Sequence, residues 1–281
     1  MCIRDRSHPG GAGGDGTAGL EVAVRFRPAM ETSGDFYDVY PLPAVPRPEG
    51  GDGPGRPDQP LLLCVADVAG KGISAALVMS RAQALLRLLA EGAAAAGGGP
   101  GDVLGRCGAV LHRDFGPGHF VACCAAVVAA PDGDAGAAAG GFRLTLANGG
   151  QVPPLLCRQG RCAELVPTGQ RLPLGVLPDA AYDDLRVELL PGDVVILASD
   201  GLPEAPRGRD LFGFERLSAA AGRWAASGSD AESIAAGIWA EVSGWCGPEA
   251  HHDDMTLLVL RVPLRATGAA PAPAAGRPRS A

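Results

Sequence analysis

The chain has 281 residues and a formal net charge of −7, with 47% hydrophobic and 20% charged residues. This length fits one large domain or two small ones, and the composition allows a substantial core. The acidic charge argues against nucleic acid as the main partner, because such binding rests on a basic surface. No uninterrupted apolar stretch reaches the length of a membrane span, and the N-terminal residues lack the apolar segment of a secretory signal, so we expect a cytoplasmic protein without a membrane partner.

The two ends of the chain show no hydrophobic periodicity. Residues 1–19 are rich in Gly and residues 264–281 are rich in Pro and Ala, so we expect both to be disordered and residues 20–263 to form the folded domain. Alternation of apolar and polar residues predicts strands over 20–27 and 36–42. We expect these two strands to pair with each other.

A buried strand that ends in an acidic turn comes next. The segment 43–60 is dense in Pro and Gly, which predicts an exposed loop between two strands. Residues 61–66 are all apolar, and a run of this length favours a strand over a helix. Asp67 ends the run, and a carboxylate at that position is costly unless a cation compensates its charge. Most Asp residues at such junctions are ordinary turn or capping residues, so Asp67 alone leaves both interpretations open.

The remaining elements fall into groups of strands and groups of helices. We expect helices over 72–91, 102–113, 214–226 and 231–245, and strands over 120–129, 142–147, 154–158, 184–190, 194–199 and 255–262. Residues 131–141 should be a hairpin tip, and Pro191-Gly192-Asp193 has the composition of a type II turn. Because strands and helices are segregated rather than alternating, we expect an α+β fold with antiparallel sheets.

The eight cysteines include no Cys-x-x-Cys pair, which argues against zinc. Several lie in apolar segments, where Cys behaves as a small hydrophobic residue. Cys157 and Cys162 are spaced to face each other across a hairpin, but in a cytoplasmic protein we expect them to remain thiols.

Three further acidic positions repeat the arrangement at Asp67. The apolar strand at 194–199 runs into Asp200, Asp253 precedes the last strand, and Asp35 precedes the strand at 36–42. If the last strand is antiparallel to the strands that end at Asp67 and Asp200, these acidic ends meet at one edge of the core.

Clustered carboxylates repel one another and raise each other's pKa, and a hard divalent cation removes that penalty. Oxygen ligands suit magnesium or manganese rather than zinc. Two such ions can hold a hydroxide and stabilise an in-line displacement at phosphorus. The residues therefore indicate a metal-dependent phosphoester hydrolase that needs no protein nucleophile.

Seven short motifs stand in the order in which they occur in one known family. They are SGDFYD (33–38), DVAGKGISAALVM (67–79), NGGQVPPLL (148–156), PLG (173–175), PGDVVILASDGLPEA (191–205), FGFERL (212–217) and DDMTLLVLRV (253–262). Together they resemble the SpoIIE/RsbU-like branch of the PPM metal-dependent protein phosphatases, from about residue 20 to residue 262. Each motif is weak evidence alone, but seven in sequence are specific.

The resemblance implies a four-layer α-β-β-α sandwich with two Mn²⁺ or Mg²⁺ ions at one end of two antiparallel sheets. The implied metal ligands are Asp35, Asp67, the backbone carbonyl of Val68, Asp200 and Asp253. Asp254 and Asp38 are expected either to support this ligand set or to have a structural role. The implied nucleophile is a metal-bound water, so no side chain is assigned to catalysis.

Two positions depart from the family pattern. Gln151 stands where the family usually has His, a change that we expect the loop to tolerate. Ala69 stands where the eukaryotic branch has a His that is a candidate general acid, so protonation of the leaving group is unassigned.

The implied activity is hydrolysis of phosphoserine or phosphothreonine in a protein, with a phosphorylated anti-sigma-factor antagonist as the expected substrate in bacterial signalling. Relatives usually carry a sensor domain before the catalytic part, and these 281 residues leave no room for one. We therefore expect either a fragment of a longer chain or a separate activator. The alternatives are a dimetal hydrolase of small phosphoesters or nucleotides, and a catalytically silent module that binds phosphoproteins.

Overall fold

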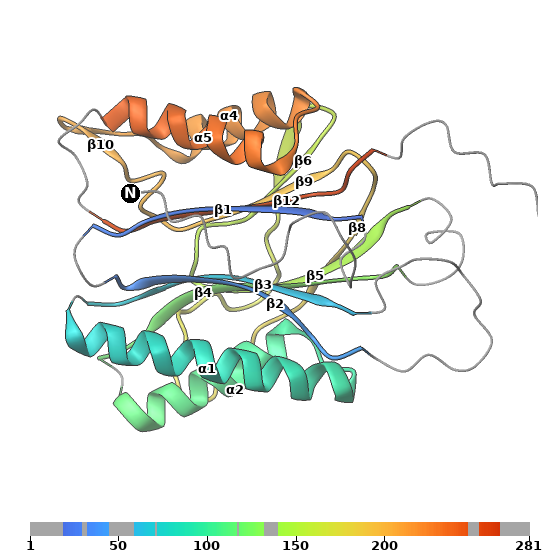
Figure 1. The fold of residues 1–281 in the computed structure, drawn as a ribbon. Coiled ribbons are helices and arrows are strands. Elements are labelled where there is room, and N and C mark those ends of the chain that lie inside the picture. Colours follow the sequence, from blue (N-terminus) through green and yellow to red (C-terminus); the bar gives the residue numbers. More distant parts are fainter. Residues whose placement is uncertain are drawn as a thin grey trace, which may run out of the picture.

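Two five-stranded antiparallel sheets pack face to face, and two helices cover the outer face of each sheet (Figure 1). The computed structural model describes residues 19–29, 33–44, 59–70, 72–116, 118–131, 140–246 and 253–264. This arrangement confirms the predicted α+β class and the four-layer α-β-β-α sandwich. The predicted N-terminal segment and C-terminal tail lie outside the described residues, apart from Gly19 and Leu264.

Sheet A has the strand order β1-β12-β9-β6-β7. Its strands are β1 (Glu21–Arg27), β12 (Met255–Arg261), β9 (Val194–Ala198), β6 (Leu155–Arg158) and β7 (Arg161–Glu164). It is covered by α4 (Phe214–Ala226) and α5 (Ala231–Cys246). A short hairpin of β10 (Pro206–Arg207) and β11 (Asp210–Leu211) precedes α4.

Sheet B has the strand order β2-β3-β4-β5-β8. Its strands are β2 (Asp35–Pro41), β3 (Leu61–Val68), β4 (Val121–Ala129), β5 (Phe142–Gly149) and β8 (Leu185–Leu189). It is covered by α1 (Ile73–Ala96) and α2 (Pro100–Phe115). All strand pairs in the two sheets are antiparallel.

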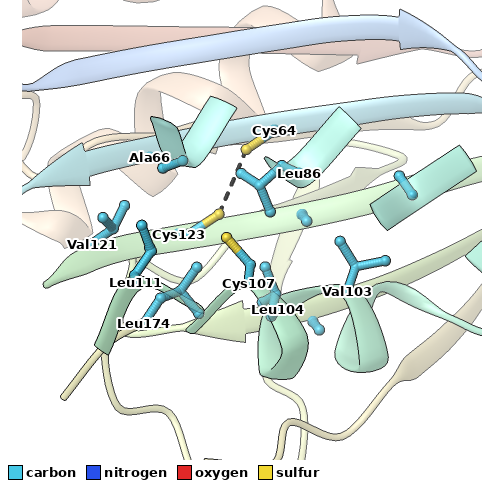
Figure 2. Packing of buried hydrophobic residues seen from close by; sticks show 14 of the residues in the cluster. Cys64, Ala66, Leu86, Val103, Leu104, Cys107, Leu111, Val121, Cys123 and Leu174 are labelled. Atoms are coloured by element: carbon cyan, nitrogen blue, oxygen red, sulfur yellow. Dashed lines mark hydrogen bonds between the residues drawn. The ribbon is translucent and has the colours of Figure 1, made fainter. Parts of the chain in front are cut away.

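The hydrophobic core has three layers, one between the sheets and one under each helix pair. Leu63 of β3 and Leu258 of β12 are fully buried between the sheets. On the other face of sheet B, Leu86 of α1 and Leu104 of α2 pack around Cys123 of β4 (Figure 2). Strands β3, β9 and β12 are therefore buried on both faces, which explains their continuous apolar sequences.

The predicted pairing of the first two strands is wrong. Strand β1 pairs with β12, and β2 pairs with β3, so the two strands lie in different sheets. Each is the edge strand of its sheet, and the residue pattern of an edge strand does not specify which sheet it joins. The sequence period therefore predicted the strands but could not identify their partners.

The cysteine prediction is also wrong. Cys157 and Cys162 are directly opposite each other on β6 and β7 and form a disulfide, with 4.0 Å between their Cα atoms. The prediction of free thiols rested on the expected compartment and not on this cross-strand geometry.

Helix α1 is the one described helix that is long and apolar enough to cross a membrane by length and composition. It packs on sheet B and on α2, and its inward face is buried. A core helix of a folded domain passes the same test, so the helix is weak evidence for a membrane span.

An ion pair between a buried carboxylate and a part-exposed arginine holds the connection between the two sheets. The turn Pro191-Gly192-Asp193 joins β8 of sheet B to β9 of sheet A, and Gly192 has the positive φ of 93° that a type II turn requires. Asp193 is 2% exposed, accepts two hydrogen bonds from Arg158 at 2.8 and 2.7 Å, and accepts a third from the backbone N–H of Leu190 at 2.7 Å. Arg158 thereby ties β6 to the turn.

We expect Asp193→Asn to lower the free energy of unfolding by about 1.5 kcal/mol, because the buried carboxylate loses its charge and one of its two acceptor oxygens, while the part-exposed Arg158 guanidinium stays hydrated. Asp102→Asn is the matched control, since Asp102 pairs with Arg106 where both side chains are more than half exposed, and it should change stability by less than about 1 kcal/mol. Urea unfolding measures both variants. Equal effects would contradict the role given to Asp193.

Candidate metal centre

Two acidic side chains of sheet B stand side by side at one end of the sandwich. Because β2 and β3 are antiparallel, Asp35 at the start of β2 lies directly opposite Asp67 near the end of β3. Gly34 precedes them, and a Cβ at Gly34 would lie 3.0 Å from the Val68 carbonyl oxygen and 3.2 Å from Oδ1 of Asp67. The missing side chain of Gly34 thus leaves room for both oxygens at this point.

Sheet A brings two more acidic side chains to the same end. Strand β12 is antiparallel to β9, so Asp200, which follows β9, and Asp253, which precedes β12, lie at the same end of their sheet. Strands β2 and β12 both begin at the left end of the sandwich in Figure 1. The structure therefore gathers the strand ends that carry Asp35, Asp67, Asp200 and Asp253.

A hydrogen bond across the sandwich fixes Asp35. Thr256 on β12 donates from Oγ1 to Oδ2 of Asp35 at 2.6 Å. Thr256 is held in turn by Ser199, whose Oγ accepts from the Thr256 N–H at 2.9 Å and whose own N–H donates to the Thr256 carbonyl. Thr256 and Ser199 were not among the predicted site residues, although both lie inside the matched motifs.

Asp254 organises the segment before β2. Its carboxylate is 8% exposed and accepts hydrogen bonds from the N–H of Ala29 at 2.6 Å, the hydroxyl of Ser33 at 2.7 Å and the N–H of Gly34 at 2.7 Å. These bonds occupy it with backbone and hydroxyl donors, as expected for a supporting residue. A Cβ at Gly201 would lie 1.9 Å from the Asp254 carbonyl oxygen, so no side chain fits after Asp200.

Asp38 lies on the opposite face of β2 and contacts α1. Its carboxylate accepts from Nε of Arg87 at 2.5 Å and from a terminal nitrogen of Arg87 at 2.8 Å. Asp38 therefore anchors α1 to sheet B, and it does not join the acidic cluster.

The loop with Gln151 is closed by local hydrogen bonds. Asn148 Oδ1 accepts from the Gln151 N–H at 2.8 Å, and Gln151 Oε1 accepts from the Val152 N–H at 2.9 Å. Gln151 is thus accommodated in a buried turn. Ala69 donates its N–H to the Phe120 carbonyl and presents no acidic side chain.

Burial and mutual repulsion disfavour the charged forms of these acids. Burial raises the pKa of Asp35 to about 7, with a further increase from the charges of Asp254 and Asp200. Burial also raises the pKa of Asp67 to about 8, and the charges of Asp35, Asp200, Asp253 and Asp254 add to the effect. The pKa of Asp200 is raised by burial and by the charges of Glu204 and Asp253. Bound cations would relieve this repulsion.

The facing carboxylates of Asp35 and Asp67 are oxygen ligands of the kind that magnesium and manganese prefer. Oδ1 of Asp35 is buried without a hydrogen-bond partner, which leaves an oxygen available to a cation. Among the described residues, no three Asp, Glu, His or Cys side chains stand close enough to hold one ion together. Magnesium usually keeps several waters and binds through one or two carboxylates, which agrees with the facing pair of Asp35 and Asp67.

Comparisons with known proteins agree with the fold. The family model described as stage II sporulation protein E (SpoIIE) matches residues 57–263, more than half of the chain. The RsbU and RsbW domains of Rv1364c from Mycobacterium tuberculosis are 25% identical, with a TM-score of 0.66 over 87% of this chain and 61% of that one. No curated protein matches the chain.

Two further solved structures share the fold at lower identity. The phosphatase domain of SpoIIE from Bacillus subtilis, solved with a fragment of its regulatory domain, is 18% identical, with a TM-score of 0.64 over 87% of this chain and 64% of that one. RsbX in complex with magnesium is 15% identical, with a TM-score of 0.56 over 86% and 95%. The chain thus spans less than two thirds of the Rv1364c and SpoIIE structures.

Without divalent cations, the chain should become less stable as the pH rises. The raised pKa values of Asp35 and Asp67 mean that the folded chain keeps protons that the unfolded chain releases above about pH 4. The stability that these retained protons provide is complete below that pH. It is lost as the pH rises through about 7 for Asp35 and about 8 for Asp67. We expect the free energy of unfolding in EDTA to fall by up to about 1.4 kcal/mol per pH unit for each retained proton.

Urea unfolding between about pH 5 and 8.5 measures this slope. Asp35→Asn should reduce it, because the amide does not titrate, whereas Asp102→Asn on the exposed surface of α2 should leave it unchanged. If the free energy of unfolding of the unsubstituted chain does not change with pH, the two carboxylates are not buried as described.

Proposed function

This chain belongs to the SpoIIE family, and from that premise we propose that it is a protein serine/threonine phosphatase that requires Mn²⁺ or Mg²⁺. The observation that carries the proposal is the meeting of acidic strand ends from both sheets at one end of a PPM-type sandwich. The magnesium in the RsbX structure supports the choice of a hard divalent cation.

The residues that would hold the ions are Asp35, Asp67, the Val68 carbonyl, Asp200 and Asp253. Divalent cations bound there supply Lewis-acid polarisation of the phosphoryl group and lower the pKa of water. The protein contributes rigid placement of the oxygens, because Thr256 holds Asp35 and Asp254 holds the segment before it. Ala69 cannot donate a proton, so we propose that the leaving serine oxygen takes its proton from water.

We further propose that the substrate is a phosphorylated anti-sigma-factor antagonist in bacterial signalling, and that the chain acts in the cytoplasm. The resemblance to RsbU-like phosphatases supports this choice, as does the relative that carries RsbU and RsbW domains together. Activation would come from a separate partner or from a sensor region of a longer protein. The SpoIIE structure with a fragment of a regulatory domain supports this arrangement.

Hydrolysis of a phosphoserine peptide should require manganese or magnesium and should fall by a factor on the order of 100 or more in Asp200→Asn. The control is Asp210→Asn on the exposed hairpin strand β11, which should retain full activity. Release of phosphate with and without EDTA measures both effects. Activity that survives EDTA or Asp200→Asn would overturn the proposal, and turnover of nucleotides but of no phosphoprotein would favour the small-phosphoester hydrolase.

Manganese should also raise the Tm of the chain, since a ligand that binds only the folded state stabilises it in proportion to the logarithm of its concentration. At 100 times its dissociation constant the ion should add about 2.7 kcal/mol. Asp67→Asn should lose most of this shift, while Asp210→Asn should keep it. A metal-induced shift with phosphopeptide binding but no turnover would favour the silent binding module.

A further inference from the structure

The β6–β7 hairpin carries a disulfide at the edge of sheet A. A two-residue turn, Gln159-Gly160, joins the strands, and both residues have positive φ values of 51° and 77°, as in a type I′ turn. Cys157 on β6 is the direct cross-strand partner of Cys162 on β7, and the disulfide joins them. In the described part of the chain, β7 pairs with no strand but β6. The disulfide is therefore a covalent link between the edge strand and the rest of the sheet.

The two sulfur atoms have different surroundings. Cys157 is 1% exposed and belongs to the core cluster under α4 and α5. Cys162 is only partly buried, and it lines a pocket of about 730 Å³ between β7 and α4. Phe214, Ser218 and Ala219 of α4 form the facing wall of this pocket. A reagent can therefore approach the disulfide from the Cys162 side.

Gly222 keeps α4 close to the hairpin without covering the disulfide. A Cβ at Gly222 would lie 3.0 Å from the Gly160 carbonyl oxygen and 3.6 Å from Sγ of Cys162. The absence of that atom leaves Cys162 in contact with the pocket while the helix still packs on the hairpin.

The buried thiols on the other side of the molecule provide a contrast. Sγ of Cys64 and Sγ of Cys123 lie 3.6 Å apart in the core under α1 and α2 (Figure 2), and both residues are at most 1% exposed. Burial raises the pKa of the neighbouring Cys107 thiol to about 12. These cysteines lack both a route to solvent and the thiolate form that exchange requires.

We propose that the pocket between β7 and α4 is a thiol-exchange site, at which a dithiol reductant opens the Cys157–Cys162 disulfide by attack on Cys162. The attacking thiolate forms a new S–S bond with Sγ of Cys162, and the bond between Cys162 and Cys157 breaks. Cys157 leaves as a thiolate and takes a proton from water. The second thiol of the reductant then displaces Cys162, so that the protein gains two thiols and the reductant becomes a cyclic or intramolecular disulfide.

Reduction should affect the edge of sheet A and leave the acidic cluster in place. Cys157 pairs with Val194 at the beginning of β9, whereas Asp200 follows the other end of that strand. Loss of the short covalent loop should lower the Tm by roughly 4–8 °C. This inference is independent of the proposed phosphatase activity.

The test is alkylation of the intact chain, purified without reductant, by N-ethylmaleimide, with labelled positions read by peptide mapping. We expect no label on Cys157 or Cys162 before reduction. After native treatment with dithiothreitol, Cys162 should be labelled, and Cys157, which is 1% exposed, should be labelled at least tenfold more slowly. The cysteines under α1 and α2 should stay unlabelled until urea is added. Label at Cys157 and Cys162 before reduction, or a disulfide that opens only in urea, would overturn the proposal.

Two pairs of variants test the direction of attack. In Cys157→Ser the remaining Cys162 thiol should react at least tenfold faster than the Cys157 thiol in Cys162→Ser. Ala219→Trp should fill the pocket and slow reduction by dithiothreitol at least fivefold. Ala240→Trp, at an exposed position of α5, is its matched control and should leave the rate unchanged. Equal rates within either pair would contradict the assignment of Cys162 as the attacked sulfur.

Discussion

The hydrogen bond from Thr256 to Asp35 joins the two sheets at the point where their acidic strand ends meet. A carboxylate buried between two sheets is costly unless fixed donors or a cation stabilise its charged form. The side chain that donates this hydrogen bond to Asp35 is Thr256, which lies on β12 in the other sheet. The position of this carboxylate therefore depends on the distance and rotation between the sheets. Any change that shifts one sheet against the other moves Asp35 relative to Asp200 and Asp253.

The antiparallel topology explains why residues so distant in sequence converge. Each acid lies in or next to the end of a strand, and the direction of that strand decides at which end of the sandwich its acid lies. Strands β3 and β9 run toward this end, whereas β2 and β12 run away from it. Small residues complete the arrangement, because Gly34 and Gly201 stand where a Cβ would meet an oxygen of the cluster or of Asp254.

Much of the fold and part of the site could be predicted from the sequence. The apolar runs of β3, β9 and β12 marked strands buried on both faces, and the acids at their ends indicated a cation site. Strand partners could not be predicted, because the residue patterns of β1 and β2 identify strands but not the sheet to which each strand belongs. Thr256 and Ser199 were missed because single hydroxyl residues are uncharged and form no periodic pattern, so nothing in the sequence distinguishes them from other Ser and Thr residues. The disulfide was missed because the prediction gave more weight to the expected cytoplasmic compartment than to the spacing of Cys157 and Cys162 across a hairpin.

The adjacency of the first and last strands of the sandwich has a consequence for synthesis of the protein. Among the described strands, β1 pairs with β12 alone, so a nascent chain on the ribosome keeps that edge unpaired until β12 has emerged. Contacts of such long sequence separation form late and slowly. Asp253 and Thr256, which donates to Asp35, belong to this late segment, so the acidic cluster is completed only when β12 joins its sheet.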